Sequence, residues 1–319
     1  MSAPPVEVEA SRPGSESSRG GAPRRRRTGR APGEPRNVAW LYILPGLTFF
    51  VLFTFFPLLH AGWLSLYDWD GITVGKFVGF DNYTKALSDP DVRVSYEHAF
   101  QLIIWYSLLP VLLGLVLTGV MTRHLVRGFT FFRTVLFLPQ MIAGVVIAQA
   151  FVWFYAAEGP FNRLLTIFVP DSWARGWLGE FGWALRAVGS IGTWVTFGLC
   201  MVLFVSGVQK IPTTLYDAAR VDGAGSVREF FVVTLPGLRY ELVVAFVLTT
   251  INALRSFDIV YNATNGGPGN ETYVPALLMY LNAFKYNEVG YACAIAVILA
   301  LIIFVLATAV NLLADRGQS

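Results

Sequence analysis

Long apolar runs separated by shorter polar stretches fill the chain from residue 38 onward. Six runs are almost free of charge and cover residues 41–59, 99–122, 134–157, 187–208, 242–262 and 289–314. A helix needs about 20 apolar residues to cross the hydrocarbon core of a bilayer. In lipid every backbone polar group must be bonded within its own segment, so each run is predicted to be helical. The pattern therefore predicts an all-α, polytopic membrane protein with six transmembrane helices.

Composition supports this prediction and separates two regions of the chain. The sequence is 55% hydrophobic and 14% charged, whereas soluble domains carry about 25% charged residues. Residues 1–37 are instead rich in Gly, Pro and Ser and contain four consecutive arginines, Arg24 to Arg27. Such a segment cannot bury enough apolar surface to fold, so it is predicted to be a disordered basic tail. Beside a membrane span, its charge favours anionic lipid over nucleic acid, and residues 38–314 form the predicted transmembrane domain.

Prolines predict where the helices break, and the Lys and Arg residues predict the orientation in the membrane. Pro57, Pro110 and Pro139 are expected to kink or end helices. Six spans place both termini on one side of the membrane, and that side carries 16 Lys and Arg residues against 7 on the other. Because basic residues accumulate on the cytoplasmic side, both termini and the loop at residues 209–239 are predicted to be cytoplasmic. Arg outnumbers Lys twenty to four, which is typical of a GC-rich bacterial source, so the expected localisation is a bacterial cytoplasmic membrane.

The loop at residues 209–239 has the pattern of a helix, a break and a second helix. Thr213 or Thr214 is expected to cap the first helix, and Gly223 to supply the turn. Ser226 is expected to cap the second helix, with Glu229 three residues later completing a capping box. Pro236 is expected to end that helix. A short helix with a small-residue face, projecting from the membrane, suits docking into a groove on another protein.

This loop resembles the EAA loop of the permease subunits of ABC importers. The family pattern is Glu-Ala-Ala, three residues, Gly, nine residues, Ile, one residue, Leu-Pro. Matching positions here are Asp217, Ala218, Ala219, Gly223, Val233, Leu235 and Pro236, with Asp in place of Glu and Val in place of Ile. The resemblance implies a type I ABC importer permease fold, in which the short helix is a coupling helix that seats in a cleft on the ATPase subunit. It assigns ATPase coupling to Asp217, Ala218, Ala219, Asp222, Gly223, Leu235 and Pro236.

The fifth apolar run is interrupted by polar residues at helical spacing. Asn252, Arg255, Asp258 and Asn262 would share one face of a continuous helix. Charged residues within a span usually face a bundle interior or a water-filled cavity, so this stripe is predicted to line a polar translocation path. The alternative is an intrahelical pair of Arg255 and Asp258 near the outer interface, with both side chains reaching toward water.

A second resemblance concerns the substrate. Ser256-Phe257-Asp258, followed by Tyr261 and by Gly266-Gly267-Pro268 in the next outer loop, is similar to the carbohydrate-uptake (maltose-type, binding-protein-dependent) branch of these permeases, as is the segment at residues 78–83. The resemblance covers residues 38–314 and implies transport of sugars, oligosaccharides or polyols and their phosphates. Aromatic side chains suit sugar rings, and Phe257, Tyr261 and Tyr280 are candidates. The glycines and Pro268 permit a sharp turn.

The absence of nucleotide-binding and catalytic motifs also limits the functions that the sequence supports. The phosphate-binding pattern G-x-x-x-x-G-K-[ST] is absent, so ATP hydrolysis is expected on a separate subunit. No catalytic set, metal-ligand cluster or cofactor motif is evident. The resemblance implies two ATPase subunits, a second homologous permease and an extracytoplasmic sugar-binding protein as partners. The competing interpretation is a stand-alone ion-coupled carrier or channel, which would need intramembrane acidic residues and would have no use for a docking helix.

Overall fold

The computed structural model describes residues 38–123 and 128–316. The predicted tail at residues 1–37, which holds 8 of the 16 basic residues assigned to the cytoplasmic side, lies outside the described residues. The chain divides into two compact units between Thr54 and Phe55. The described part of the first unit is α1 (Val38–Phe50), which runs into a π-helical turn, η1 (Val51–Phe55).

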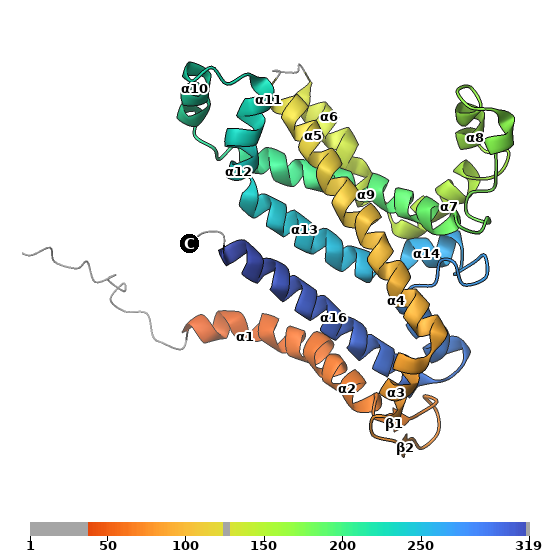
Figure 1. The fold of residues 1–319 in the computed structure, drawn as a ribbon. Helices are drawn as coiled ribbons and strands as arrows, with labels where there is room; N and C mark the ends of the chain where they lie inside the picture. The colour runs from red at the N-terminus through yellow and green to blue at the C-terminus, as the bar shows by residue number, and fades with distance from the viewer. Residues whose placement is uncertain (1–37, 124–127, 317–319) are drawn as a thin grey trace, which may run out of the picture. The chain divides into compact units, whose positions relative to one another are not determined.

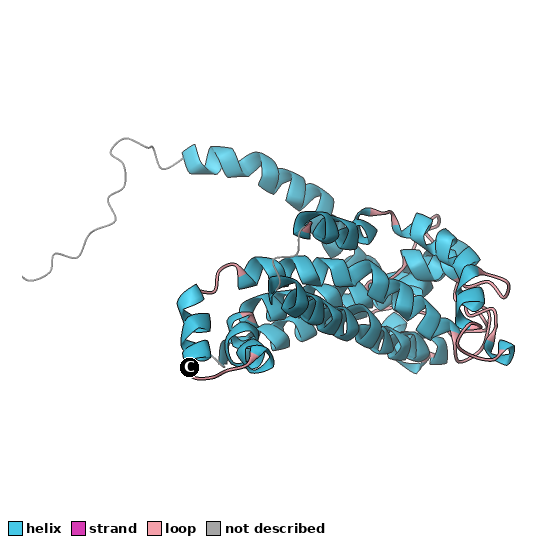
Figure 2. Ribbon diagram, turned by 90° about the horizontal axis from the view of Figure 1, so that it is seen from above, coloured by secondary structure: helices cyan, strands magenta, loops and turns pink. Residues whose placement is uncertain are grey.

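The second unit is almost entirely helical (Figure 2). Its first elements are α2 (Phe56–Leu64), a hairpin of β1 (Tyr67–Asp68) and β2 (Lys76–Phe77), α3 (Asp81–Ser88), α4 (Pro90–Ile103), η2 (Ile104–Leu108), α5 (Leu109–Arg123), α6 (Phe129–Phe137), η3 (Leu138–Met141), α7 (Gly144–Phe154), α8 (Pro160–Leu165) and η4 (Asp171–Trp173). There follow α9 (Ala184–Val208), α10 (Thr213–Val221), α11 (Ser226–Glu229), η5 (Phe230–Thr234), α12 (Leu235–Gly237), α13 (Arg239–Leu254), α14 (Asp258–Ala263), α15 (Pro275–Tyr280), η6 (Leu281–Lys285) and α16 (Val289–Arg316). The two antiparallel strands pair Tyr67 with Phe77 and Asp68 with Lys76.

Four of the predicted spans are single helices that are long and apolar enough to cross a membrane: Tyr42–Leu64, Pro90–Val120, Ala184–Val208 and Val289–Ala314. The second begins nine residues before the predicted residue 99. Asp89 caps it by accepting from the Asp91 backbone N–H at 2.9 Å, and Arg93 pairs with Glu97 one turn later. A capped, charged first segment therefore extends this helix beyond its apolar part, where hydropathy gives no signal.

The third and fifth predicted spans are not straight helices. Thr130–Met141 and Gly144–Phe154 meet at 97°. Arg239–Leu254 meets Ser226–Gly237, which lies in the loop before the fifth predicted span, at 69°. The described residues therefore contain four continuous candidate spans, or up to six if each bent pair is one span. The expected break at Pro139 is confirmed, since it lies in the 3-10 turn that ends α6. The predicted helix at residues 242–262 ends instead at Leu254 and resumes at Asp258.

A π-helical turn also precedes three prolines, in continuous helices at Pro57 and Pro110 and just ahead of the 69° bend at Pro236. A π-helical turn ends two residues before Pro57, Pro110 and Pro236, at η1, η2 and η5 respectively. Proline has no backbone N–H and its ring clashes with the carbonyl four residues earlier. Widening the preceding turn by one residue relieves that clash and allows the helix to continue. The expected kinks at Pro57 and Pro110 are therefore π-helical turns within helices that carry on.

In the interior of the second unit, other segments pack closely against the glycines of α9. A Cβ added to Gly192 or Gly189 would overlap the side chains of Tyr106 or Trp105, and one added to Gly198 would overlap the backbone carbonyl of Leu136. Small residues at such interfaces allow membrane helices to pack closely. The core of this packing contains Leu102, Val188, Ile191, Met201 and Phe204, all fully buried.

The second unit has two distinct ends (Figure 1). Helices α10 to α12 lie at one end, and α3, α8, α14 and the hairpin lie at the other. The end of α16 is close to the start of α13, because the Arg239 guanidinium donates to the Ala314 carbonyl at 3.0 Å. The loop at residues 209–239 and the C-terminal end of α16 therefore share one end of the unit.

Candidate functional site

The break after α10 is a helix-ending turn that requires a left-handed residue. Asp222 is the last residue before the turn, and Gly223 has φ of +75°. The Gly223 N–H donates to the Arg220 carbonyl at 3.0 Å, and the Ala224 N–H donates to the Ala219 carbonyl at 2.9 Å. This pair of bonds is the Schellman arrangement, in which glycine is favoured because it has no Cβ. The predicted turn at Gly223 is confirmed.

The caps predicted for the two helices of the loop are wrong. Pro212 precedes α10 and Gly225 precedes α11, and neither helix has a side-chain cap. Ser226 is the first residue of α11, one place beyond its expected position. Glu229 does not turn back to the helix start, because its carboxylate accepts hydrogen bonds from Arg220. The cationic Arg220 guanidinium donates two hydrogen bonds to this carboxylate, whereas a capping box would supply one from a neutral backbone N–H.

Most of the predicted coupling residues lie at the surface. Asp217, Ala218, Asp222, Gly223 and Pro236 are exposed, and Ala219 and Leu235 are half-buried. The helix α10 contains no buried residue. Leu215 and Val221 are also exposed, at 52% and 87%. They lie three residues to either side of Ala218, so they extend its surface into an apolar stripe. These two residues were not among the predicted coupling residues, although their helical spacing was a usable signal.

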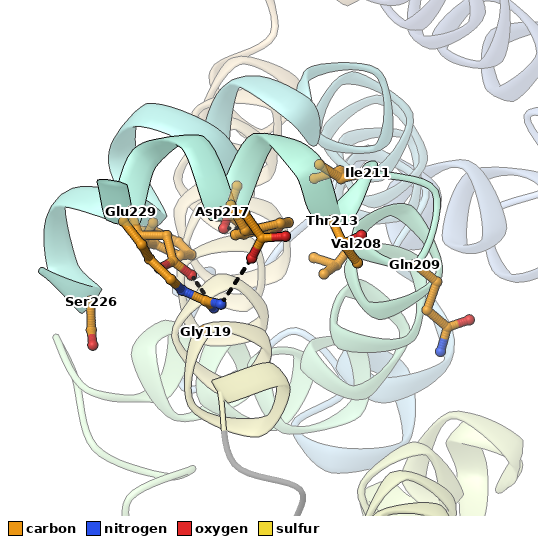
Figure 3. A pocket seen from close by; sticks show the side chains of 12 residues that line it. Gly119, Val208, Gln209, Ile211, Thr213, Asp217, Ser226 and Glu229 are labelled. Carbon is orange, nitrogen blue, oxygen red and sulfur yellow. Dashed lines mark hydrogen bonds and ion pairs between the residues drawn. The ribbon is translucent and has the colours of Figure 1, made fainter. Parts of the chain in front are cut away.

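Asp217 lies on the inner side of α10. Its carboxylate oxygen is 3.5 Å from Nη1 of Arg220, and both side chains line a pocket of about 520 Å³ (Figure 3). The other lining residues come from α5, α9, the link after α9, α10 and the helix that follows: Gly119, Val208, Gln209, Ile211, Thr213, Tyr216, Ser226, Glu229, Phe230 and Thr234. The hydrogen bond to Glu229 and the charge of that carboxylate raise the pKa of Arg220. Two acidic side chains thus hold one guanidinium between α10 and α11.

An ion pair also joins the two ends of the loop at residues 209–239. The Lys210 Nζ atom lies 2.9 Å from the Glu241 carboxylate, which joins the end of α9 to the start of α13. A Cβ at Gly207 would crowd Leu238 and Glu241, so the two helices approach closely here. The Glu241 side chain is only 11% exposed, and a carboxylate so shielded is costly unless it is paired.

The predicted stripe on the fifth span is not one helical face. Helix α13 ends at Leu254, Arg255 to Phe257 form a short irregular joint, and α14 begins at Asp258. Helix α14 packs on α7, where the Gln149 side chain donates to the Asn262 carbonyl at 3.1 Å. Tertiary packing of this kind overrides the local preference for a continuous helix. Among the described residues, Arg255 and Asp258 form no ion pair, so the alternative of an intrahelical pair is also not observed.

The candidate path residues form an exposed polar group and an aromatic cluster. Asn252, Arg255 and Asp258 are exposed. Phe257 and Tyr261 stack with ring centroids 5.2 Å apart, and both contact the Tyr280 ring at 5.4 and 5.1 Å. The three aromatic candidates therefore form one cluster. The Asn262 amide donates to the Asp258 carbonyl at 2.7 Å, so this amide nitrogen is already engaged.

The Gly266-Gly267-Pro268 segment forms a tight, hydrogen-bonded turn with a cis bond before Pro268. The Thr272 hydroxyl donates to the Gly267 carbonyl at 3.0 Å and lies 2.7 Å from the Thr264 hydroxyl. Gly266 has φ of +90°. A Cβ on this residue would overlap the Tyr273 ring. The predicted turn is confirmed, and its glycine is required by both conformation and packing.

Replacing Gly266 with alanine should therefore lower the thermal stability of the purified protein. The left-handed backbone costs of order 1–3 kcal/mol for a residue with a side chain, and the methyl group must also displace Tyr273. The matched control is Gly267→Ala, because a Cβ there meets only the Thr264 carbonyl oxygen at 3.4 Å, an ordinary contact. Melting in detergent compares the two variants, and equal midpoints would contradict the structural role assigned to Gly266.

Known proteins are similar to this chain in sequence and in fold. A family described as "Binding-protein-dependent transport system inner membrane component" matches residues 110–317. A probable ABC transporter permease protein of Bacillus subtilis, YurN, is 36% identical over 83% of this chain and 91% of its own length. The multiple sugar-binding transport system permease protein MsmF of Streptococcus mutans is 32% identical over 83% and 90%. The diacetylchitobiose uptake system permease protein NgcF of Streptomyces coelicolor is 31% identical over 97% and 90%.

A solved structure has the same fold. A bacterial alginate ABC transporter, in complex with an alginate pentasaccharide-bound periplasmic protein, contains a chain that matches with a TM-score of 0.76. The match covers 88% of this chain and 94% of that chain at 19% sequence identity. At this identity the likeness concerns the fold alone.

Proposed function

This chain belongs to the family of binding-protein-dependent transport system inner membrane components, and on that premise we propose that it is the permease subunit of an ATP-driven importer of sugars or related polyols. Family membership favours this role over a stand-alone carrier or channel. The chain is a multi-pass membrane protein. Its proposed location is a bacterial cytoplasmic membrane, with both termini and the loop at residues 209–239 in the cytoplasm.

The observation that carries the proposal is the surface of α10. This short helix lies at the end of the helical unit, exposes Leu215, Ala218 and Val221, and ends in a fixed turn at Gly223. Exposed apolar side chains on a helix outside the bundle suit a protein groove. We assign that groove to an ATPase subunit, which would bind and hydrolyse ATP. Closure of two such subunits would move α10 and drive alternating access.

The proposed substrate class rests on the relatives and on the joint after α13. Curated relatives include permeases named for multiple sugars and for diacetylchitobiose. The aromatic cluster of Phe257, Tyr261 and Tyr280 offers ring faces, and the exposed Asn252, Arg255 and Asp258 offer donors and acceptors to hydroxyl groups. We propose that a second permease completes the path and that an extracytoplasmic binding protein delivers the sugar.

Capture of the intact complex tests this function. The chain carries a C-terminal tag, native membranes are solubilised mildly, and the captured proteins are identified. A co-purifying ATPase, a second permease and a binding protein are the expected result. Repeated capture of the chain alone in stable form would contradict the proposal and return the ion-coupled carrier as the working hypothesis.

A further inference from the structure

The helix α10 has little packing to hold it in place. None of its residues is buried, and a pocket of about 520 Å³ separates it from α5 and α9. The link from α10 to α11 is four residues long and includes Gly223 and Gly225. Burial of apolar side chains normally fixes one helix relative to another. For α10 that contribution is small, so its position depends on a few polar contacts.

The strongest of these contacts runs through Arg220. Its Nε and Nη2 atoms donate to the two oxygens of the Glu229 carboxylate, at 3.1 and 3.4 Å. This two-pronged geometry fixes direction as well as distance. Glu229 is well shielded, with 15% of its side chain exposed. Nη1 of the same guanidinium reaches Asp217 at 3.5 Å, so the arginine holds two points of the loop.

A weaker contact supports the same arrangement. The Tyr216 hydroxyl lies 3.2 Å from the Thr234 hydroxyl and joins α10 to η5. From Ser226 the chain is helical through α11, η5 and α12 to Gly237, and α13 follows after the 69° bend. A displacement of α10 can therefore be transmitted to α13 through this helical segment, provided that α10 and α11 do not rotate relative to each other about the turn.

We propose that Arg220 is a positioning residue that locks α10 to α11, so that movement imposed on α10 reaches α13 instead of being lost in the turn. The inference rests on the proposed function, because it takes an ATPase as the source of the movement. It assigns Arg220 to transmission of movement and not to docking. Loss of the arginine should leave the ATPase bound while weakening the response of α13.

The test follows α13 directly and needs no identified sugar. In the complex captured from native membranes, Cys293 is replaced by alanine and Asn252, exposed near the end of α13, by cysteine. A maleimide then labels this cysteine with and without ATP plus vanadate. Cys200 remains, because its side chain is fully buried. The labelling rate reports the movement of α13, and ATP hydrolysis is measured on the same sample.

With the unsubstituted loop, ATP plus vanadate should change the labelling rate. In Arg220→Ala the ATPase should still co-purify and hydrolyse ATP, whereas the change in labelling should shrink roughly threefold to tenfold. The conservative variant Arg220→Lys keeps the positive charge beside Glu229 and Asp217 but not the two-pronged geometry, so it should retain part of the change. The matched control is Arg228→Ala, an exposed arginine of α11 that forms no ion pair with any described residue. It should behave like the unsubstituted loop.

The other possible results would contradict either the positioning role of Arg220 or the proposed function. An unchanged response in Arg220→Ala, or no response in the unsubstituted complex, would overturn the positioning role. Loss of the ATPase from Arg220→Ala, with the control intact, would make Arg220 a docking residue and would also overturn it. Absence of an ATPase from the unsubstituted capture would instead contradict the proposed function itself, and the inference with it.

Discussion

Replacement of Gly198 by valine should remove most of the folded protein from the membrane. Gly198 lies in α9 where that helix crosses the end of α6, and an added Cβ would overlap the Leu136 carbonyl oxygen. The obstructing atom is backbone, so no rotamer change can relieve the overlap. The carbonyl also belongs to the turn that precedes Pro139 and the 97° bend, which leaves it little freedom to move.

The expected cost is large relative to the stability of a typical protein. Overpacking a tight interface costs up to about 3 kcal/mol and occasionally more, against a total stability of about 5–15 kcal/mol. Size-exclusion profiles of detergent extracts should show a strong loss of monodisperse protein, and the remainder should melt at a lower temperature.

The control for this variant is Gly62→Val, in the helix α2. A Cβ at Gly62 has nothing within 4 Å, so this variant should extract and melt like the unsubstituted chain. Both changes place the same side chain on a helical glycine and differ only in what the side chain meets. Equal yields and equal melting temperatures for the two variants would contradict the close approach of α9 and α6.

Replacement of Gly223 by valine should uncouple the ATPase from the membrane helices. The reason is conformational, because a Cβ at this position would meet open space. At φ of +75° a branched side chain is strained by of order 1–3 kcal/mol. Strain of that size should shift the turn to another conformation and reduce the ATP-dependent labelling of the cysteine at position 252 roughly tenfold.

Asparagine at position 223 separates conformation from bulk. Asparagine tolerates the left-handed region far better than valine does, although the two side chains are of similar size. Gly223→Asn should therefore retain most of the response that Gly223→Val loses. Equal losses in both variants would show that the size of the side chain, and not the turn, decides coupling at this position.

The sequence predicted what depends on composition and local conformation. Apolar runs located the helix Val289–Arg316 within two residues of its observed end, because lipid requires helical backbone. The left-handed turns at Gly223 and Gly266 were also predictable, since few other residues adopt that conformation.

What escaped prediction depends on contacts between distant segments. Hydropathy could not reveal the joint at Arg255 to Phe257, because that joint follows from the packing of α14 on α7. The capping box at Ser226 failed because Glu229 has a better partner nine residues earlier, in Arg220. The apolar surface of α10 was predicted from its alanines alone, although the helical spacing of Leu215 and Val221 already places them on the same face.

The π-helical turn at Ile104–Leu108 has an evolutionary consequence. A π-helical turn is an α-helical turn that has accommodated one extra residue. Loss of one residue there would restore α-helical geometry and rotate everything before it by about 100° relative to α5. Ser107, whose hydroxyl lies 2.6 Å from that of Thr249 on α13, would then lose its register with that helix. Relatives that lack one residue at this place should therefore also carry a different residue at the position of Thr249. In this family a deletion in the second span and a substitution in α13 should thus occur together.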